Sequence, residues 1–220
     1  MFAAWEAGVW KALSDGFHPD LIVGASAGAW NGWAIAGEVS ADGLIAEWLD
    51  GSLAAIRIFH PEPLHQKARE LYSRFRPALP FGLTVVETPR LGVRLVSGPE
   101  ITWRHMAATC SIPVFFPPVL IGNRRYVDGG VRGALPLWAA QELGATRAVA
   151  VNCLMGLPFR MLRTVLGPRP PGAGFPVAYI IPSQPLGSLR DAIYWSRPNI
   201  QRWIALGERD GKRALSSITM

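Results

Sequence analysis

The chain has 220 residues, of which 50% are apolar and 17% are charged. This balance excludes an intrinsically disordered chain and suffices for the core of one domain, so we expect residues 1–220 to form a single domain. The net charge of +6 is uneven, because residues 143–220 carry 10 basic and 3 acidic side chains. This basic third fits peripheral contact with anionic lipid headgroups, and it fits an ordinary solvated surface equally well. No array of interleaved basic and aromatic residues is present, so we expect no nucleic-acid partner.

The chain also lacks the signals of export and of metal binding. Its N-terminus has no basic segment of the signal-peptide kind. Residues 21–37 are uncharged, but they are too short and too rich in Gly and Ser for a transmembrane helix. Cys110 and Cys153 have no metal-ligand or redox spacing and fit free thiols in a reducing compartment. We therefore expect a cytoplasmic protein, in peripheral contact with a membrane at most, that needs no metal or cofactor.

Periodicity predicts the elements in chain order. A helix runs from the first residues to Leu13, and a short buried strand at 21–24 leads into a helix over 27–37. Later elements are expected as helices near 41–50, 63–75, 101–109, 135–143 and 199–216 and as strands at 83–88, 93–96, 126–128, 148–152 and 177–181. A loop rich in Pro and Gly is expected at 156–175. Strands that alternate with helices and read as apolar runs predict an α/β sandwich with a largely buried sheet.

The stretch LIVGASAGAW, residues 21–30, places Ser26 in a Gly-x-Ser-x-Gly pattern between the expected strand and helix. A serine on a sharp strand-to-helix turn needs small neighbours, and Gly24, Ala27 and Gly28 are small. Such a turn exposes the hydroxyl and places the N–H of Ala27 and the positive end of the helix beside it, where an oxyanion would be stabilised. Ser26 is therefore a candidate nucleophile, and the alternative is a structural turn that contains a serine.

A serine nucleophile needs a base. The histidines are His18, His60, His65 and His105, so the late histidine of the α/β-hydrolase order is absent. We expect His60 and His65 in a surface loop and His105 in a helix, where it is the residue to test for a histidine-dependent esterase. Asp-Gly occurs five times, and only Asp128 follows a strand-like run and precedes a second Gly. A carboxylate there is a candidate base if burial raises its pKa.

Two long blocks carry a resemblance to a known family. EAGVWKALSDGFHPDLIVGASAGAWNG and AATCSIPVFFPPVLIGNRRYVDGGVRGALPLWAAQELGA resemble the patatin-like phospholipases, and the likeness extends over roughly residues 3–153. It implies a three-layer sandwich with a central, mostly parallel sheet. It also implies that Ser26 is the nucleophile and Asp128 the proton acceptor of a Ser–Asp dyad, with Gly129 and Gly130 completing the Asp-Gly-Gly motif. The implied reaction is hydrolysis of acyl esters of phospholipids or other lipids, without a metal or cofactor.

The chain departs from the family pattern at its N-terminus. The family has a strand and a Gly-Gly-Gly-x-Arg/Lys-Gly loop before its first helix, and the loop's N–H groups build the oxyanion hole. Aligned through Ala7 and Gly8, this chain has only MFAAWE there. We therefore expect the first strand and the loop to be absent, which would leave a gap in the centre of the sheet. Either the true start lies upstream, or the chain is an impaired member of the family that binds lipid surfaces without catalysis.

Overall fold

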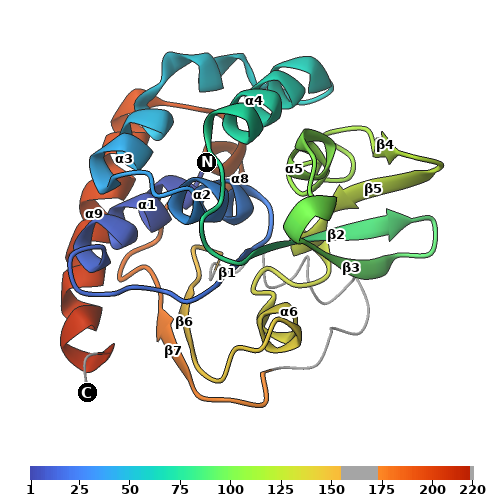
Figure 1. The fold of residues 1–220 in the computed structure, drawn as a ribbon. Coiled ribbons are helices and arrows are strands. Elements are labelled where there is room, and N and C mark those ends of the chain that lie inside the picture. Colours follow the sequence, from blue (N-terminus) through green and yellow to red (C-terminus); the bar gives the residue numbers. More distant parts are fainter. Residues whose placement is uncertain (155–172, 219–220) are drawn as a thin grey trace.

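A computed structural model describes residues 1–154 and 173–218 (Figure 1). Its helices are α1 (Ala3–Leu13), α2 (Ala27–Ala36), α3 (Ala41–Leu49), α4 (Pro61–Arg74), α5 (Trp103–Ala108), α6 (Leu137–Glu142), α8 (Leu189–Ile193) and α9 (Arg197–Ile218). Its strands are β1 (Ile22–Gly24), β2 (Phe81–Thr88), β3 (Gly92–Ser97), β4 (Val119–Ile121), β5 (Arg124–Asp128), β6 (Ala148–Val151) and β7 (Val177–Ile180). Three short 3₁₀ helices are η1 (Gly51–Ala55), η2 (Gly98–Glu100) and η3 (Gly129–Val131).

Each helix and strand expected from periodicity is present, with ends that differ by a few residues. The sequence prediction missed β4 and α8, which have three and five residues and are too short to show a periodic pattern. It was wrong for His65, which lies inside α4 and not in a surface loop. The loop expected at 156–175 lies almost entirely outside the described residues.

The main sheet is mixed, so the expectation of a mostly parallel sheet was wrong. Its order is β1-β2-β5-β4, with β3 paired to β2, and only the β1–β2 pairing is parallel. The cause lies in the connections, because β2–β3 and β4–β5 are hairpins and a short turn joins only antiparallel neighbours. A second sheet consists of the parallel pair β6 and β7. Within the described residues no strand precedes α1, and the lack of the family's first strand stays a prediction, as does the single domain.

Strand β2 organises the sheet around one point. Because β3 lies along one edge of β2, β1 and β5 share the other edge. β1 runs parallel to β2 and ends with Gly24 opposite Leu83, whereas β5 runs antiparallel and ends with Asp128 opposite Val85. The two strands therefore approach each other end to end beside Thr84.

Helices cover both faces of this sheet. Figure 1 shows α2, α4 and α5 on one face and α6 on the other, with α1 and α9 packed together at the side. The backbones of α1 and α9 nearly touch, since a Cβ on Gly8 would lie 2.1 Å from the carbonyl oxygen of Ile204 and one on Gly207 would lie 2.0 Å from that of Trp5. The contact fixes α1 firmly against the rest of the chain.

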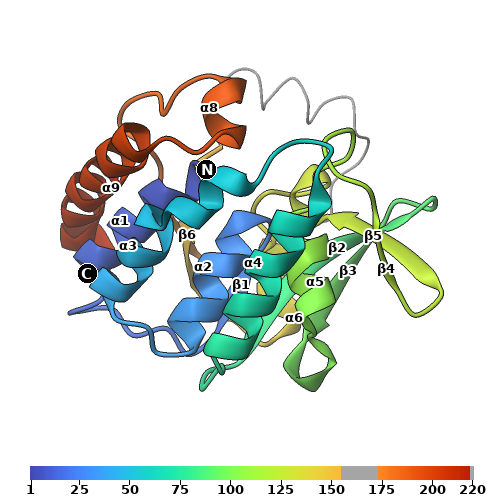
Figure 2. The ribbon, with the colours of Figure 1, turned by 90° about the horizontal axis from the view of Figure 1, so that it is seen from above.

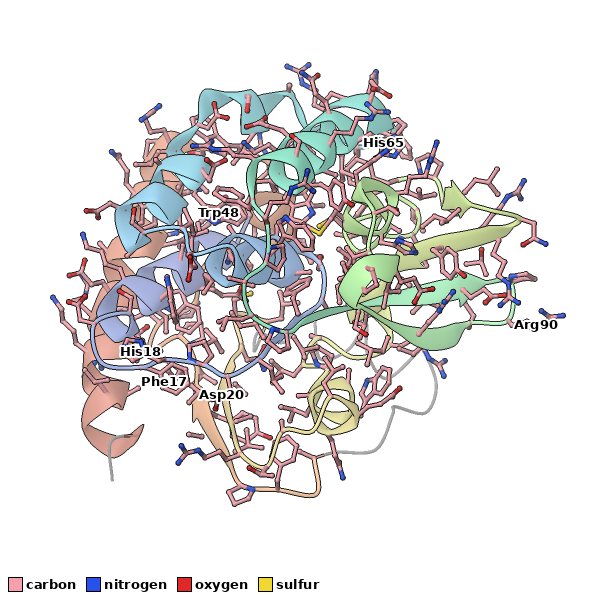
Figure 3. The ribbon with its side chains drawn as sticks, viewed as in Figure 1. Phe17, His18, Asp20, Trp48, His65 and Arg90 are labelled. Carbon is pink, nitrogen blue, oxygen red and sulfur yellow. The ribbon has the colours of Figure 1, made fainter. Side chains whose placement is uncertain are left out.

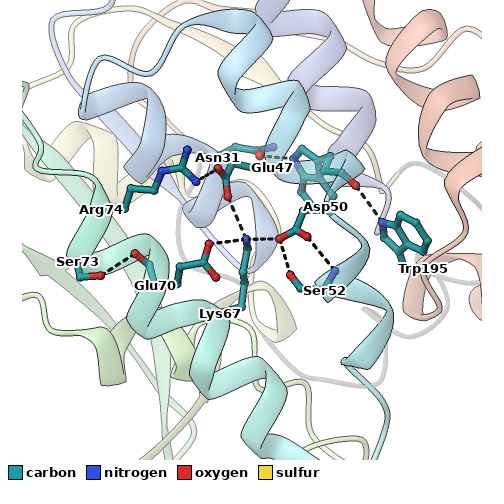
Figure 4. Close-up of polar contacts among 10 residues, drawn as sticks. Asn31, Glu47, Asp50, Ser52, Lys67, Glu70, Ser73, Arg74 and Trp195 are labelled. Atoms are coloured by element: carbon teal, nitrogen blue, oxygen red, sulfur yellow. Dashed lines mark hydrogen bonds and ion pairs between the residues drawn. The ribbon is translucent and has the colours of Figure 1, made fainter.

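An ion cluster centred on the buried Lys67 and Glu47 joins α3 to α4 (Figure 4). The ammonium of Lys67 donates hydrogen bonds to Glu47 at 3.0 Å, to Asp50 at 3.2 Å and to Glu70 at 3.1 Å. Close by, the indole N–H of Trp48 donates to Asn31 Oδ1 at 2.8 Å. The cluster and this bond together brace α2, the helix that follows Ser26.

Candidate active site

Ser26 occupies the turn between β1 and α2. Its φ of 55° and ψ of −140° belong to a conformation that L residues rarely adopt. Gly24 is required beside it, because a Cβ there would lie 2.6 Å from Cα of Ala29. The Ser26 N–H donates to Thr109 Oγ1 at 2.9 Å, and the Thr109 hydroxyl donates to the carbonyl oxygen of Thr84, also at 2.9 Å. The strained turn is thus tied to the middle of β2.

Asp128 is the last residue of β5 and is only 3% exposed. The hydroxyl of Ser26 donates to its Oδ2 at 2.6 Å, and the N–H of Gly130 donates to its Oδ1 at 2.7 Å. A Cβ on Gly129 would lie 2.2 Å from the carbonyl oxygen of Thr84, so only glycine fits directly after the aspartate. Both carboxylate oxygens therefore have fixed partners. The structure brings together the two residues singled out in the sequence, while their catalytic roles stay predictions.

The electrostatics of Asp128 suit proton transfer. Burial raises the pKa of its carboxyl from 3.8 to about 7, against the lowering effect of the hydrogen bonds from Ser26 and from the Gly130 N–H. A buried carboxylate with this pKa is a far stronger base than an exposed aspartate. Near neutral pH it can accept a proton from the serine and return it.

Comparison with family models matches residues 1–88 and 97–140 to the family described as patatin-like phospholipase. These residues make up well over half of the chain and include both Ser26 and Asp128. The chain belongs to the patatin-like phospholipase family. The resemblance seen in the sequence is therefore confirmed. Helices α8 and α9 lie beyond the matched residues of this patatin-like chain.

Solved structures support the patatin-like fold. The crystal structure of VipD from Legionella pneumophila matches with a TM-score of 0.58 at 11% sequence identity. The match covers 98% of this chain and 65% of the VipD chain. At this identity the likeness concerns the fold alone. No curated protein sequence matches the chain.

A second carboxylate lies at the N-terminal end of α2 in this patatin-like site. The N–H groups of Ala27 and Gly28 belong to the first turn of the helix and have no partner within it. Glu6, on α1, is half-buried. Its carboxylate lies beside this helix end, because Oε2 would be 3.3 Å from a Cβ added to Gly28. Oε2 also accepts a hydrogen bond from Asn31 Nδ2 at 3.2 Å. Burial raises the pKa of Glu6 to about 7, so both forms exist near neutral pH.

The sequence prediction did not single out Glu6 or Thr109. A signal for Glu6 was present, because it is the one acidic residue of α1 and its neighbours in sequence, Trp5 and Ala7, are buried. Thr109 carries no such signal. Its contact with Ser26 depends on how α5 packs, across 83 residues of sequence.

The histidines lie apart from the serine–aspartate pair. His18 and His60 are exposed, and His65 lies in α4 (Figure 3). His105 is buried in α5, where its Nδ1 accepts a hydrogen bond from the N–H of Thr102 at 3.2 Å. Within the described part of the chain, no hydrogen bond joins a histidine to either member of the pair. The geometry thus favours the carboxylate as the base.

Two thiols border this arrangement, Cys110 beside Ser26 and Cys153 beside Glu6. Burial raises the pKa of Cys110 and of Cys153 well above the ordinary thiol value, so both thiols are neutral and neither is an activated nucleophile. Among the described residues, no group of three or more His, Cys, Asp and Glu side chains could hold a metal ion. None of the described helices has the length and apolar character needed to cross a bilayer.

Proposed function

We propose that this chain is a serine acyl-ester hydrolase that acts on phospholipids or other lipid esters through a Ser26–Asp128 dyad. The observation that carries the proposal is the 2.6 Å hydrogen bond from the Ser26 hydroxyl to the buried carboxylate of Asp128. Membership of the patatin-like phospholipase family supports the substrate class.

The proposed cycle has two steps. In the first, Ser26 Oγ attacks the acyl carbonyl while Asp128 Oδ2 accepts the hydroxyl proton, and the alcohol leaves with that proton. In the second, Asp128 takes a proton from water while the hydroxide attacks the acyl carbonyl, and Asp128 then returns the proton to Ser26 Oγ as the fatty acid leaves. The N–H of Ala27 and the positive end of α2 stabilise the oxyanion formed in each step.

A second candidate function is lipid-surface binding by a catalytically impaired member of the family. The observation that favours it is Glu6, whose carboxylate lies beside Gly28 in the first turn of α2. An ionised carboxylate there repels the developing oxyanion and lowers the rate.

Hydrolysis of p-nitrophenyl butyrate by the purified chain separates the two candidates. The hydrolase proposal predicts that Ser26→Ala and Asp128→Asn each lower kcat/KM by at least about 10³-fold. Ser73→Ala and Asp42→Asn, at exposed positions, are the matched controls and leave the rate unchanged. Equal rates for the wild type and the Ser26→Ala variant would reject the proposed dyad, and vesicle binding without turnover would support the second candidate.

A further inference from the structure

Two loops carry large apolar side chains into solvent side by side. Phe59 lies at the tip of a turn closed by a bridge between Arg57 and His60, just before α4, and it is 67% exposed. Val114 lies in the loop between α5 and β4 and is 82% exposed. The N–H of Phe59 donates to the carbonyl oxygen of Phe115 at 2.8 Å, which ties the two loops together. We call Phe59 and Val114 the apolar tips.

Both tips have a backbone conformation that is unfavourable for their side chains. Phe59 has a φ of 64° and Val114 a φ of 75°. Glycine and asparagine tolerate this left-handed conformation, whereas a β-branched residue such as valine is an outlier in it. Among the described residues, neither burial nor backbone preference accounts for an apolar side chain at either position. A contact with a partner would account for both.

The loop that carries Val114 also contacts the serine–aspartate pair. The loop that carries Val114 begins at Thr109, which holds the N–H of Ser26, and continues through Ser111, whose carbonyl oxygen accepts from the N–H of Asp128. Val114 follows Ser111 by three residues, so their Cα atoms are at most about 11 Å apart. A surface that covers Val114 therefore meets the same loop whose first residues contact Ser26 and Asp128.

The charges around the tips favour an anionic surface as the occupant. Arg57, two residues before Phe59, is exposed and takes part in none of the ion pairs between described residues. Figure 2 shows that the segment leading into α4 lies at an outer edge of the molecule. Protruding apolar tips, with the exposed Arg57 in the same turn as Phe59, suit the interface of an anionic bilayer.

We propose that Phe59 and Val114 insert into the surface of an anionic lipid bilayer and hold the serine–aspartate pair against it. The inference rests on the proposed function in one respect: a lipid hydrolase must reach esters in a bilayer, which gives the docking its purpose. The docking itself requires no turnover.

The test uses the full chain in a Ser26→Ala background, which leaves vesicle lipids intact. Phe59→Asn and Val114→Asn, alone and together, are compared with the parent by cosedimentation with vesicles of phosphatidylcholine and phosphatidylglycerol. The double variant is expected to partition at least about tenfold less, because both apolar side chains are lost from the interface. Arg57→Gln is expected to weaken binding to these vesicles and to leave binding to pure phosphatidylcholine unchanged.

Leu91→Asn is the matched control. Leu91 is 46% exposed, has a φ of 53° and lies at the tip of the β2–β3 hairpin, next to Arg90 at the edge of the molecule (Figure 3). Its substitution is expected to leave vesicle binding unchanged. Asparagine tolerates a positive φ, so we expect the three asparagine variants to melt at or above the temperature of the parent. An unchanged or higher melting temperature shows that a loss of vesicle binding is not due to unfolding.

Hydrolysis of p-nitrophenyl butyrate by chains that keep Ser26 separates this inference from the proposed function. The double variant is expected to cleave this soluble ester at the wild-type rate and vesicle phospholipid more slowly. Equal vesicle binding by the double variant and the parent overturns the inference. Failure of the parent to bind vesicles also overturns it and makes a protein partner the occupant. If no ester is cleaved while vesicle binding still requires the tips, the proposed function fails and the docking surface stands.

Discussion

The hydroxyl of Ser26 donates a hydrogen bond of 2.6 Å to Asp128, which lies 102 residues further along the chain. The register of β2 explains this closeness. β1 ends opposite Leu83 and β5 ends opposite Val85, on the same edge of β2 and from opposite directions. Each strand delivers one member of the pair to the junction. The sheet therefore sets the distance between them, with no need for a mobile loop to bring them together.

The first prediction concerns the acid limb of the pH–rate profile. Asp128 must be ionised to accept the serine proton, and burial raises its pKa to about 7. We expect kcat/KM for p-nitrophenyl butyrate to be lost as the pH falls through about 7. Initial rates measured from about pH 5 to about pH 9 test this. A limb near the ordinary aspartate pKa of about 3.9 would show that Asp128 is not the group that titrates.

The second prediction concerns stability. Asp128 has a folded-state pKa of about 7, above its ordinary value of 3.8, so the native state binds its proton more tightly than the unfolded chain does. The free energy of unfolding therefore falls as the pH rises between these two values. Asp128→Asn removes this loss, and we expect it to stabilise the chain by about 2–4 kcal/mol more at pH ~8 than at pH ~4. Urea denaturation at both pH values measures the difference, and equal effects at the two would contradict the raised pKa.

The local structure around Ser26 was predictable, because the strand, the tight turn and the helix all lie within one short stretch. Small residues on both sides of the serine marked the turn, and apolar periodicity marked the helix. The partnership with Asp128 depended on the resemblance of two distant blocks to one family, because no local pattern reveals a contact across 102 residues.

The sheet was harder to predict for a physical reason. Gly122 and Asn123 form a two-residue hairpin turn between β4 and β5, and Gly122 has a φ of 60°. This short Gly-Asn signal was not recognised, so the antiparallel pairings were missed. Glu6 and Thr109 act through packing between elements, which depends on the assembled fold and not on spacing along the chain.

The third prediction concerns the alkaline limb of the profile. Glu6 lies beside Gly28 at the end of α2 where the proposed mechanism places the oxyanion, and burial raises the pKa of Glu6 to about 7. As the pH rises through this value, the carboxyl gains a negative charge that opposes the oxyanion. We expect the wild-type rate to fall on the alkaline side, and Glu6→Gln to convert the fall into a plateau. An alkaline limb that persists in Glu6→Gln would assign it to another group.

The fourth prediction treats Thr109 as a positioning residue. Its hydroxyl accepts from the Ser26 N–H and donates to the carbonyl oxygen of Thr84. Thr109→Val keeps the shape but removes both bonds, so we expect a loss of about 1–3 kcal/mol in the free energy of unfolding and at least about tenfold in kcat. Thr109→Ser keeps the hydroxyl and is expected to restore kcat. Equal kcat for the two variants would show that the hydroxyl does not position Ser26.

The last prediction concerns the ion cluster that braces α2. Burial alone would lower the pKa of Lys67, but the hydrogen bonds and charges of Glu47 and Glu70 outweigh it and hold the pKa above its ordinary value. The ammonium therefore stays charged at any ordinary pH. Lys67→Met leaves the buried carboxylate of Glu47 with Arg74 alone, and we expect the free energy of unfolding to fall by about 3 kcal/mol.

The exposed pair of Lys212 and Glu208 supplies the matched control, and Lys212→Met is expected to change stability by less than about 0.5 kcal/mol. A double variant with Lys67→Met and Glu47→Gln should recover part of the loss, because the carboxylate that lost its main partner is then neutral. Urea denaturation of the four chains completes the cycle. If the double variant is as unstable as the sum of the two single ones, Lys67 and Glu47 act independently, and the bracing of α2 must come from apolar packing instead.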